Sequence, residues 1–273
     1  MAVISQCTIE TALRNEKTFL KSSLCTQPFK IVDITEDKQQ NRLRLMLMSS
    51  SPGILDGDEY SFQIDVRERC CLELQTQSYQ RIFQMKTGAK QQLEVRMEKD
   101  ASFIYLPHPS VPHEGSTFIS QNKIYLAEDC SLIWGEVMSC GRKLNGEVFK
   151  FSSYHTRTEI YQYGKLVVKE NLLIQPAKIA VSAIGQMENY SHQATLIYIH
   201  EEINASMLIQ NLVEDLNEKD NIAFGISALP VNGVIVRLLG NKAEHLFNLL
   251  GEMALYFNTS NEKTIVEPSA YVV

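Results

Sequence analysis

The sequence predicts a mainly β protein with two α-helices in its C-terminal third. From Leu43 to about residue 200, apolar side chains recur at every second position in run after run, which is typical of strands with one buried face. After residue 203 the spacing changes twice to the three-and-four spacing of an amphipathic helix. Short polar turns separate the runs, and no Pro-, Gly- and Ser-rich linker divides the chain. We therefore expect a single domain over residues 1–273.

The turn at residues 50–58 joins two of the clearest strands. Leu43, Leu45 and Leu47 alternate with polar or longer side chains before it, and residues 59–66 alternate after it. Pro52 fixes φ at one corner, and the two glycines tolerate positive φ. The pattern predicts a compact double turn, with Asp56 serving the turn itself.

The remaining strands follow in order, and the first thirty residues are weakly patterned. We expect strands at residues 18–24, 28–32, 43–48, 59–66, 71–77, 93–97, 102–106, 116–119, 123–126, 132–138, 152–163, 165–169, 171–174, 179–183, 194–200, 222–228 and 233–239. Residues 152–163 present one wholly polar face, which fits exposure to water as well as a hydrated channel or a partner interface.

Two helices complete the prediction. The first spans residues 203–217, with Asn204 or Ser206 as its N-cap. The second follows Gly240, and its apolar stripe can serve the core or a partner. The residues of that stripe that we select as partner-binding candidates are Leu246, Leu250, Met253 and Phe257. The polar tail at about 258–273 is expected to be flexible or to order against a partner.

Composition excludes several classes of protein. The net charge of −6 and the scattered basic residues argue against a nucleic-acid surface, which needs a concentrated basic field. No signal peptide and no run of eighteen apolar residues is found, so we expect a cytoplasmic protein without a membrane partner. The six cysteines lack CxxC spacing and are expected to be reduced and mostly buried.

Polar residues inside apolar runs are the main candidates for a site. Glu136 interrupts an apolar strand beside the only tryptophan, and a buried carboxylate needs a partner. A cluster of Glu136, Arg142 and Glu147 would satisfy these charges mutually, whereas a polar interior passage or cation site is the functional alternative. His108 and His113, in a proline-rich segment, lack a third ligand nearby and are expected to be exposed.

No common catalytic motif occurs in the chain. The sequence contains no GxSxG, GxxxxGK[ST], GxGxxG or HExxH pattern, so nucleophile-elbow, P-loop, dinucleotide and zincin chemistry has no local support. His200-Glu201-Glu202 and His113-Glu114 place ligand-type residues side by side, but neither supplies three ligands locally. The usual enzyme classes are therefore disfavoured.

An ordered set of short motifs resembles the family of urease accessory proteins UreD, also called UreH. The motifs are Ser51-Pro52-Gly53 with Gly57-Asp58, Thr76-Gln77-Ser78 with Arg81-Ile82-Phe83, Tyr105-Leu106-Pro107 with Pro109 and Pro112, Glu136 with Gly141-Arg142, Gly146-Glu147 with Phe149 and Phe151, and Arg237-Leu238-Leu239-Gly240. The resemblance covers residues 40–257, and the first thirty residues match poorly. The family pattern does not demand histidine at His108, so no metal role is transferred to it.

The resemblance implies a non-enzymatic maturation factor, with strands stacked in a helical, β-helix-like fashion and two helices. Such a factor binds UreF, which recruits the GTPase UreG, and the complex delivers nickel to the urease apoprotein. No cofactor is bound tightly, and Ni²⁺ is in transit. In the family a polar internal passage is proposed to conduct the ion. The resemblance therefore implies a set of residues that line the passage or handle the ion. The candidates are Asp58, Thr76, Gln77, Glu136, Arg142, Glu147 and His155.

Within this set, Asp58 lies at the start of the strand expected at residues 59–66, and its side chain is expected to face the polar interior. Two alternatives to an ion passage stay open. A β-solenoid hydrolase or lyase would need paired carboxylates, and a purely structural scaffold would tolerate neutral replacements at Asp58, Glu136 and Glu147.

Overall fold

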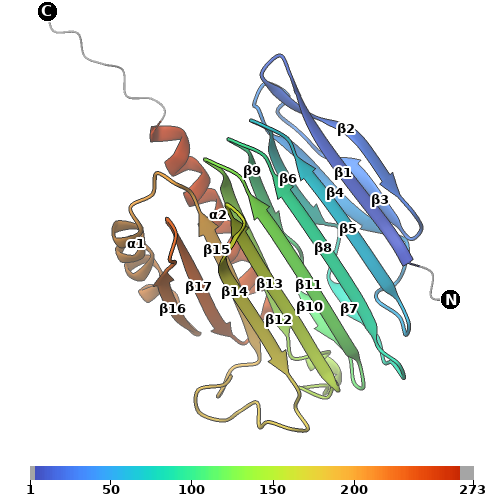
Figure 1. The fold of residues 1–273 in the computed structure, drawn as a ribbon. Helices are drawn as coiled ribbons and strands as arrows, with labels where there is room; N and C mark the ends of the chain where they lie inside the picture. Colours follow the sequence, from blue (N-terminus) through green and yellow to red (C-terminus); the bar gives the residue numbers. More distant parts are fainter. Residues whose placement is uncertain (1–3, 265–273) are drawn as a thin grey trace, which may run out of the picture.

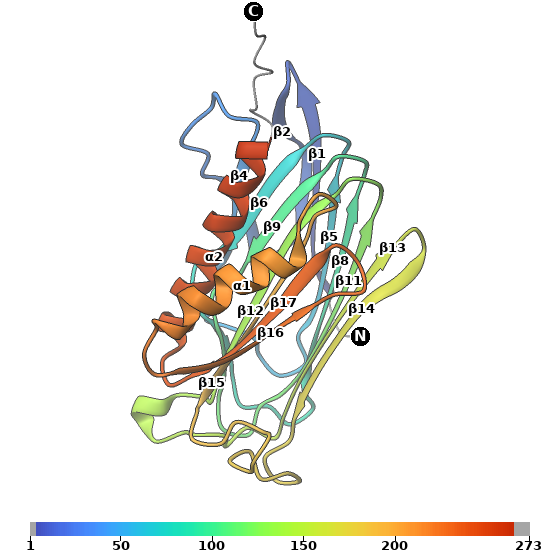
Figure 2. The ribbon, with the colours of Figure 1, turned by 90° about the vertical axis from the view of Figure 1, so that its left-hand side faces the viewer.

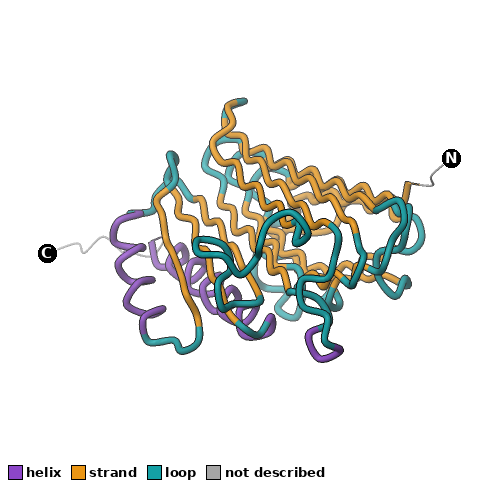
Figure 3. The backbone as a smooth tube through the Cα atoms, turned by 90° about the horizontal axis from the view of Figure 1, so that it is seen from below, coloured by secondary structure: helices purple, strands orange, loops and turns teal. Residues whose placement is uncertain are grey.

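Two β-sheets pack face to face, and two helices cover the outer face of the larger sheet (Figures 1 and 2). The computed structural model describes residues 4–264, with side chains described as far as Asn258. Seen from below, the strands form two layers with both helices at the side of one of them (Figure 3). The prediction of a mainly β protein with two helices near the C-terminus is confirmed.

The smaller sheet has seven strands. Across the sheet they are β14 (Lys165–Ile174), β13 (Ser153–Gln162), β11 (Thr117–Leu126), β8 (Ala89–Met97), β5 (Glu59–Val66), β1 (Ile4–Arg14) and β2 (Lys17–Cys25). The four central pairings, from β1 to β13, are parallel, and the two outer pairings are antiparallel.

The larger sheet has ten strands. Across it lie β16 (Ile222–Ala228), β17 (Gly233–Gly240), β15 (His192–Ile199), β12 (Ser131–Ser139), β9 (Ser102–Leu106), β6 (Cys71–Thr76), β4 (Leu43–Ser49) and β3 (Phe29–Asp33), and β10 (Ser110–Pro112) pairs with β12 and with β7 (Gln80–Ile82). The proline-rich segment thus contributes a short extra strand, in which Pro112 has no N–H to donate.

From β4 to β13 the longer strands of the chain alternate between the two sheets. Because each strand pairs with the strand two steps away in this alternation, the centres of both sheets are parallel. Antiparallel pairings toward the edges make both sheets mixed. The β-helix-like stacking that the resemblance implies is therefore not confirmed.

Four strand predictions need correction. The two strands expected at 165–169 and 171–174 are one continuous strand, β14. The weakly patterned N-terminus forms the eleven-residue strand β1. The two strands expected at 116–119 and 123–126 are one continuous strand, β11, because the polar residues between them lie inside the ladder. The strand expected at 179–183 is absent, since turns occupy that segment.

The main core lies between the sheets, and a second core lies under the helices. Helix α1 (Ala205–Asn217) begins after Asn204, whose side chain accepts a hydrogen bond from the Met207 backbone nitrogen, so the first of the two expected caps is used. Helix α2 (Ala243–Thr264) packs across β15, β12, β17 and β9. Gly135 permits this contact, because a Cβ there would lie 3.1 Å from Leu250 Cδ1 of α2 and 2.5 Å from Leu106 Cδ2 of β9.

The apolar stripe of α2 belongs to this second core. The four partner-binding candidates are only 0–3% exposed: Leu246, Leu250, Met253 and Phe257. Phe257 also stacks on Tyr198, with ring centroids 4.4 Å apart. In the chain by itself the stripe holds the helix to the sheet, and these four side chains are not exposed. Of the tail expected at 258–273, residues up to Thr264 continue the helix, and the rest lies outside the described residues.

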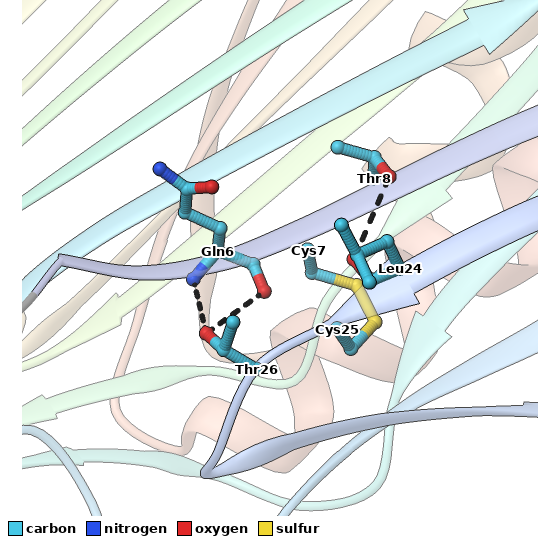
Figure 4. Close-up of a disulfide and its surroundings, with 6 residues drawn as sticks. All are labelled: Gln6, Cys7, Thr8, Leu24, Cys25 and Thr26. Carbon is cyan, nitrogen blue, oxygen red and sulfur yellow. Dashed lines mark hydrogen bonds between the residues drawn. A yellow bond between two sulfur atoms is a disulfide. The ribbon is translucent and has the colours of Figure 1, made fainter.

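A disulfide joins the two strands at one edge of the smaller sheet (Figure 4). Cys7 on β1 and Cys25 on β2 are direct partners in the antiparallel register, so their side chains meet on one face. The expectation of reduced cysteines is wrong for this pair. Cys70, Cys130 and Cys140 are buried thiols outside this disulfide. Among the residues that the structure describes, neither helix is long and apolar enough to cross a membrane.

Candidate functional site

A cavity of about 150 Å³, lined by both apolar and polar side chains, lies between the two sheets. The smaller sheet contributes side chains such as Gln91, Asn122 and Thr156 to its wall, and the larger sheet contributes Trp134 and Glu136. A sandwich interior is normally apolar, so polar residues on inward positions of adjacent strands mark this region as unusual.

Glu136 is the centre of the polar wall. Its Oε1 accepts hydrogen bonds from Trp134 Nε1 at 2.8 Å, Asn122 Nδ2 at 3.0 Å and Thr158 Oγ1 at 2.8 Å. The fold dictates this meeting: residues 134 and 136 share a face of β12, and Asn122 and Thr158 are register partners on β11 and β13. One carboxylate oxygen is thereby fixed by three neutral donors.

The charge of Glu136 has no counter-cation in the cavity. Among the described lining residues, Glu136 is the only Asp or Glu, and neither Lys nor Arg occurs. Burial raises the pKa of the Glu136 carboxyl, and the hydrogen bonds from Trp134 and Thr158 oppose that rise. Burial and the nearby carboxylate also raise the pKa of Tyr105 and Tyr154, which keeps both phenols neutral. The cavity thus contains one acidic side chain and no Lys or Arg among its described lining residues.

The predicted ion cluster of Glu136, Arg142 and Glu147 does not form. Arg142 instead makes a bidentate pair with Glu147, with Nε 2.9 Å from Oε2 and a second contact from Nη2 to Oε1. Glu147 also accepts a hydrogen bond from the Glu114 backbone nitrogen, and the Arg142 hydrogen bond lowers the pKa of its carboxyl. This pair fixes the connection between β12 and β13, and neither residue lines the cavity.

Three loops frame the mouth of the cavity: residues 51–53, 77–79 and 107–108. Thr76 and Gln77 line it, and Gln77 is exposed. Gly53 lets its turn lie directly on β7, since a Cβ there would be 2.3 Å from the Arg81 carbonyl oxygen. The turn of residues 50–58 thus forms part of the rim.

The two acids of that turn have different roles. Asp56 Oδ1 accepts hydrogen bonds from the backbone nitrogens of Thr87 and Gly88 and from Thr87 Oγ1, which lowers its pKa and ties two loops together. Asp58 Oδ2 accepts from the Leu55 nitrogen at 2.7 Å and from Tyr60 Oη at 2.6 Å. Tyr60 lines the cavity but Asp58 does not, so the expectation that Asp58 faces the interior is wrong.

His155 lies on the opposite side of β13 from the cavity. Its neighbours Tyr154 and Thr156 are buried and line the wall, whereas His155 Nε2 lies 2.9 Å from Asn171 Oδ1 on the outer surface. The structure therefore does not bring His155 to the cavity. His113, expected to be exposed, is buried against the Phe83 ring, and this burial lowers its pKa.

No preformed metal centre accompanies the cavity: the described residues hold no group of three or more His, Cys, Asp or Glu side chains placed to share a metal ion. Of the seven ion-handling candidates, the structure brings Thr76, Gln77 and Glu136 to the cavity.

The donors to Glu136 were missed from the sequence. For Asn122 the sequence does contain a signal. In the strand at residues 117–126, Ser120 and Asn122 lie on the same face as the buried Phe118 and Ile124. Polar residues at inward positions of a period-two pattern indicate a polar interior.

Comparison with known proteins identifies the relatives of this chain. The model of the family described as UreD urease accessory protein matches residues 4–268. The chain belongs to the UreD family. The match extends the motif-based resemblance to the N-terminus, so β1 and β2 are part of the UreD fold although the first thirty residues lack clear motifs.

Several relatives are named urease accessory protein UreD. The protein from Flavobacterium johnsoniae is 46% identical over 247 residues, covering 90% of this chain and 89% of the relative. The protein from Actinobacillus pleuropneumoniae serotype 3 is 34% identical over 261 residues, covering 91% and 96%. The protein from Acetivibrio thermocellus is 32% identical over 247 residues, covering 90% and 94%. Membership of the UreD family supports a role in urease maturation.

Proposed function

We propose that this chain is a cytoplasmic, non-catalytic urease maturation factor that passes Ni²⁺ through its inter-sheet cavity to apo-urease. It acts as one domain that binds UreF and, through UreF, the GTPase UreG. Family membership supports the maturation role. The observation that carries the passage is the Glu136 carboxylate, which faces a polar cavity without a counter-cation among the described lining residues.

The geometry suits transient handling of a divalent cation. Glu136 supplies a negative charge, and the hydroxyl and amide oxygens around it are hard ligands that can replace water on the ion. A volume of this size holds about five water molecules, so the ion can keep part of its hydration shell. One carboxylate without further charged ligands binds weakly, and a conduit requires weak binding because the ion must leave.

The enzymatic alternative has no support from the cavity. Glycoside hydrolases and similar enzymes use two carboxylates with different pKa values, about 5–10 Å apart. Among the described lining residues Glu136 is the only carboxylate. If the chain is a purely structural scaffold, neutralising Glu136 leaves urease activation unchanged. If Ni²⁺ passes through the cavity, the same change lowers urease activation.

The test replaces Glu136 with Gln, which keeps the shape and an acceptor oxygen but removes the charge. The variant is co-expressed with urease and the other accessory proteins, and the nickel content and activity of purified urease are measured. We expect both to fall about tenfold, because the cavity loses the attraction of a charge in a low-dielectric site.

The matched control is Glu94→Gln, which removes a carboxylate from the outer face of β8, where Glu94 pairs with Arg96. Size-exclusion chromatography checks that each variant still forms the complex with UreF and UreG. If urease made with Glu136→Gln in an intact complex has full nickel content, the proposed ion passage is contradicted. If both variants lose the complex, the defect lies in assembly of the complex.

A further inference from the structure

His108 lies at the mouth of the cavity, in the loop between β9 and β10. Pro107 and Pro109 flank it and restrict the backbone on both sides. The side chain is half-buried and belongs to the cavity wall, so it lies between solvent and the polar interior.

The imidazole ring is held by contacts from three elements. It stacks on Phe247 of α2, with centroids 4.8 Å apart and planes at 24°, and the Tyr79 ring lies 6.0 Å away. Its Nδ1 is 3.2 Å from Thr76 Oγ1, which also accepts the His108 backbone N–H at 2.8 Å. Ring plane and ring rotation are thus both set before any ligand arrives.

The contact between Thr76 Oγ1 and Nδ1 can select the tautomer of the ring. Histidines that bind metals commonly donate the distal ring N–H to a neighbouring oxygen, which fixes the tautomer and orients the free nitrogen. When Thr76 Oγ1 accepts from Nδ1–H, the lone pair of the neutral imidazole is on Nε2. Nε2 has no hydrogen-bond partner among the described residues.

We propose that His108 Nε2 is the first ligand that Ni²⁺ meets at the cavity mouth, positioned by Thr76 and Phe247. The proposal rests on the proposed function, and it names the residue that receives the ion. Imidazole nitrogen is a borderline ligand that suits Ni²⁺ better than Mg²⁺ or Ca²⁺. The ring exchanges with one water of the hydrated ion, and a single protein ligand releases it readily to the oxygen-lined interior.

Negative charge also lies beside this mouth. Glu244, in the first turn of α2, is three residues before Phe247, and burial together with the Glu244 charge raises the pKa of Tyr79. An anionic side chain close to the rim increases the local concentration of divalent cations.

The test uses the full chain with isotopically labelled histidine, titrated with Ni²⁺ alone. The chain has six histidines, and His108→Gln assigns the resonance of interest. We expect paramagnetic broadening of the His108 ring signals at the lowest Ni²⁺ concentrations. Thr76→Val should weaken this response about tenfold through loss of the positioning oxygen, and Thr76→Ser should restore it.

His155→Gln is the matched control, because it removes a half-buried histidine from the outer face of β13. It should leave the titration of His108 unchanged. Broadening that spreads equally over all histidines, or that Thr76→Val leaves unaltered, would overturn the inference. The proposed function is judged separately, by urease nickel content with Glu136→Gln.

Discussion

Glu136 is a half-buried acid in the wall of the cavity. Three neutral donors converge on one of its oxygens, yet burial still raises the pKa of the carboxyl. A buried charge without an ion partner lowers stability relative to a neutral group of the same shape. Its presence in the centre of a sandwich therefore favours a functional role over a structural one.

The pH dependence of stability follows from this raised pKa. The folded protein holds the Glu136 proton more tightly than the unfolded chain does, so its stabilising contribution is present at low pH. That contribution is lost as the pH rises through the folded pKa. We expect Glu136→Gln to melt at the same temperature as the unmodified chain, or higher, at pH 8, and the difference to shrink toward pH 4.

Thermal unfolding monitored by circular dichroism across this pH range measures the effect. Glu94→Gln, on the outer surface, should show no gain at pH 8. A melting temperature that falls at pH 8 with Glu136→Gln would mean that the ionised carboxylate stabilises the fold.

The sequence identified Glu136 as a candidate but not the residues that donate hydrogen bonds to it. Glu136 could be identified because it interrupts an apolar run. Arg142 was its expected ion-pair partner because it is the nearest basic residue along the chain. Arg142 lies beyond the end of β12, where it meets Glu147 instead. Strand register brings Asn122 beside Thr158, 36 residues away, and packing of the two sheets brings both to Glu136. A local pattern contains neither.

The C-terminal helix is the element whose role differs most from the sequence prediction. Its apolar stripe was assigned to a partner, and the structure buries it on the larger sheet. A stripe at helical spacing looks the same in sequence in either case, because both surfaces demand one apolar face.

Leu250→Ala tests the assignment of this helix to the core. Leu250 is fully buried against the sheet, so truncation should lower the free energy of unfolding of the chain alone by about 3 kcal/mol. Denaturant unfolding measures it. The exposed Met207 on α1 supplies the control, and Met207→Ala should change stability little. If the Leu250→Ala chain is as stable as the unmodified chain, the stripe does not hold the helix to the sheet, and a role in partner binding is favoured.

Most strands were predictable because period two is a local signal. The strands at residues 59–66, 102–106 and 222–228 match the predicted bounds. β1 was missed because inward positions such as Cys7 and Thr11 are not strongly apolar, although both are buried.

The arrangement of the whole molecule was less accessible from the sequence. Short turns between strands are typical of local antiparallel pairing, yet from β4 to β13 many of these turns connect different sheets, and the paired strands are parallel. Pairing between strands about 30 residues apart is decided by the burial of both faces of the sandwich, and no single segment encodes it.

The disulfide constrains the unfolded chain as a whole. It closes a loop of 18 residues between Cys7 and Cys25, and its removal should lower the free energy of unfolding by about 3 kcal/mol. Adding dithiothreitol should therefore lower the melting temperature of the unmodified chain. A double variant, Cys7→Ser with Cys25→Ser, should melt at the lower temperature with or without the reductant. Identical melting of the oxidised and reduced chain would show that the bond does not stabilise the fold.

The alternation along β13 makes the cavity sensitive to strand alignment. Tyr154, Thr156 and Thr158 face inward, and the outer face carries Arg157 and Glu159. If one residue were inserted before this strand without any compensating bulge, every side chain would change sides. The guanidinium of Arg157 would then lie beside Glu136 as a built-in counter-ion. A cavity neutralised in this way would no longer attract a cation, so length changes near residue 153 should be rare among relatives that retain the acid.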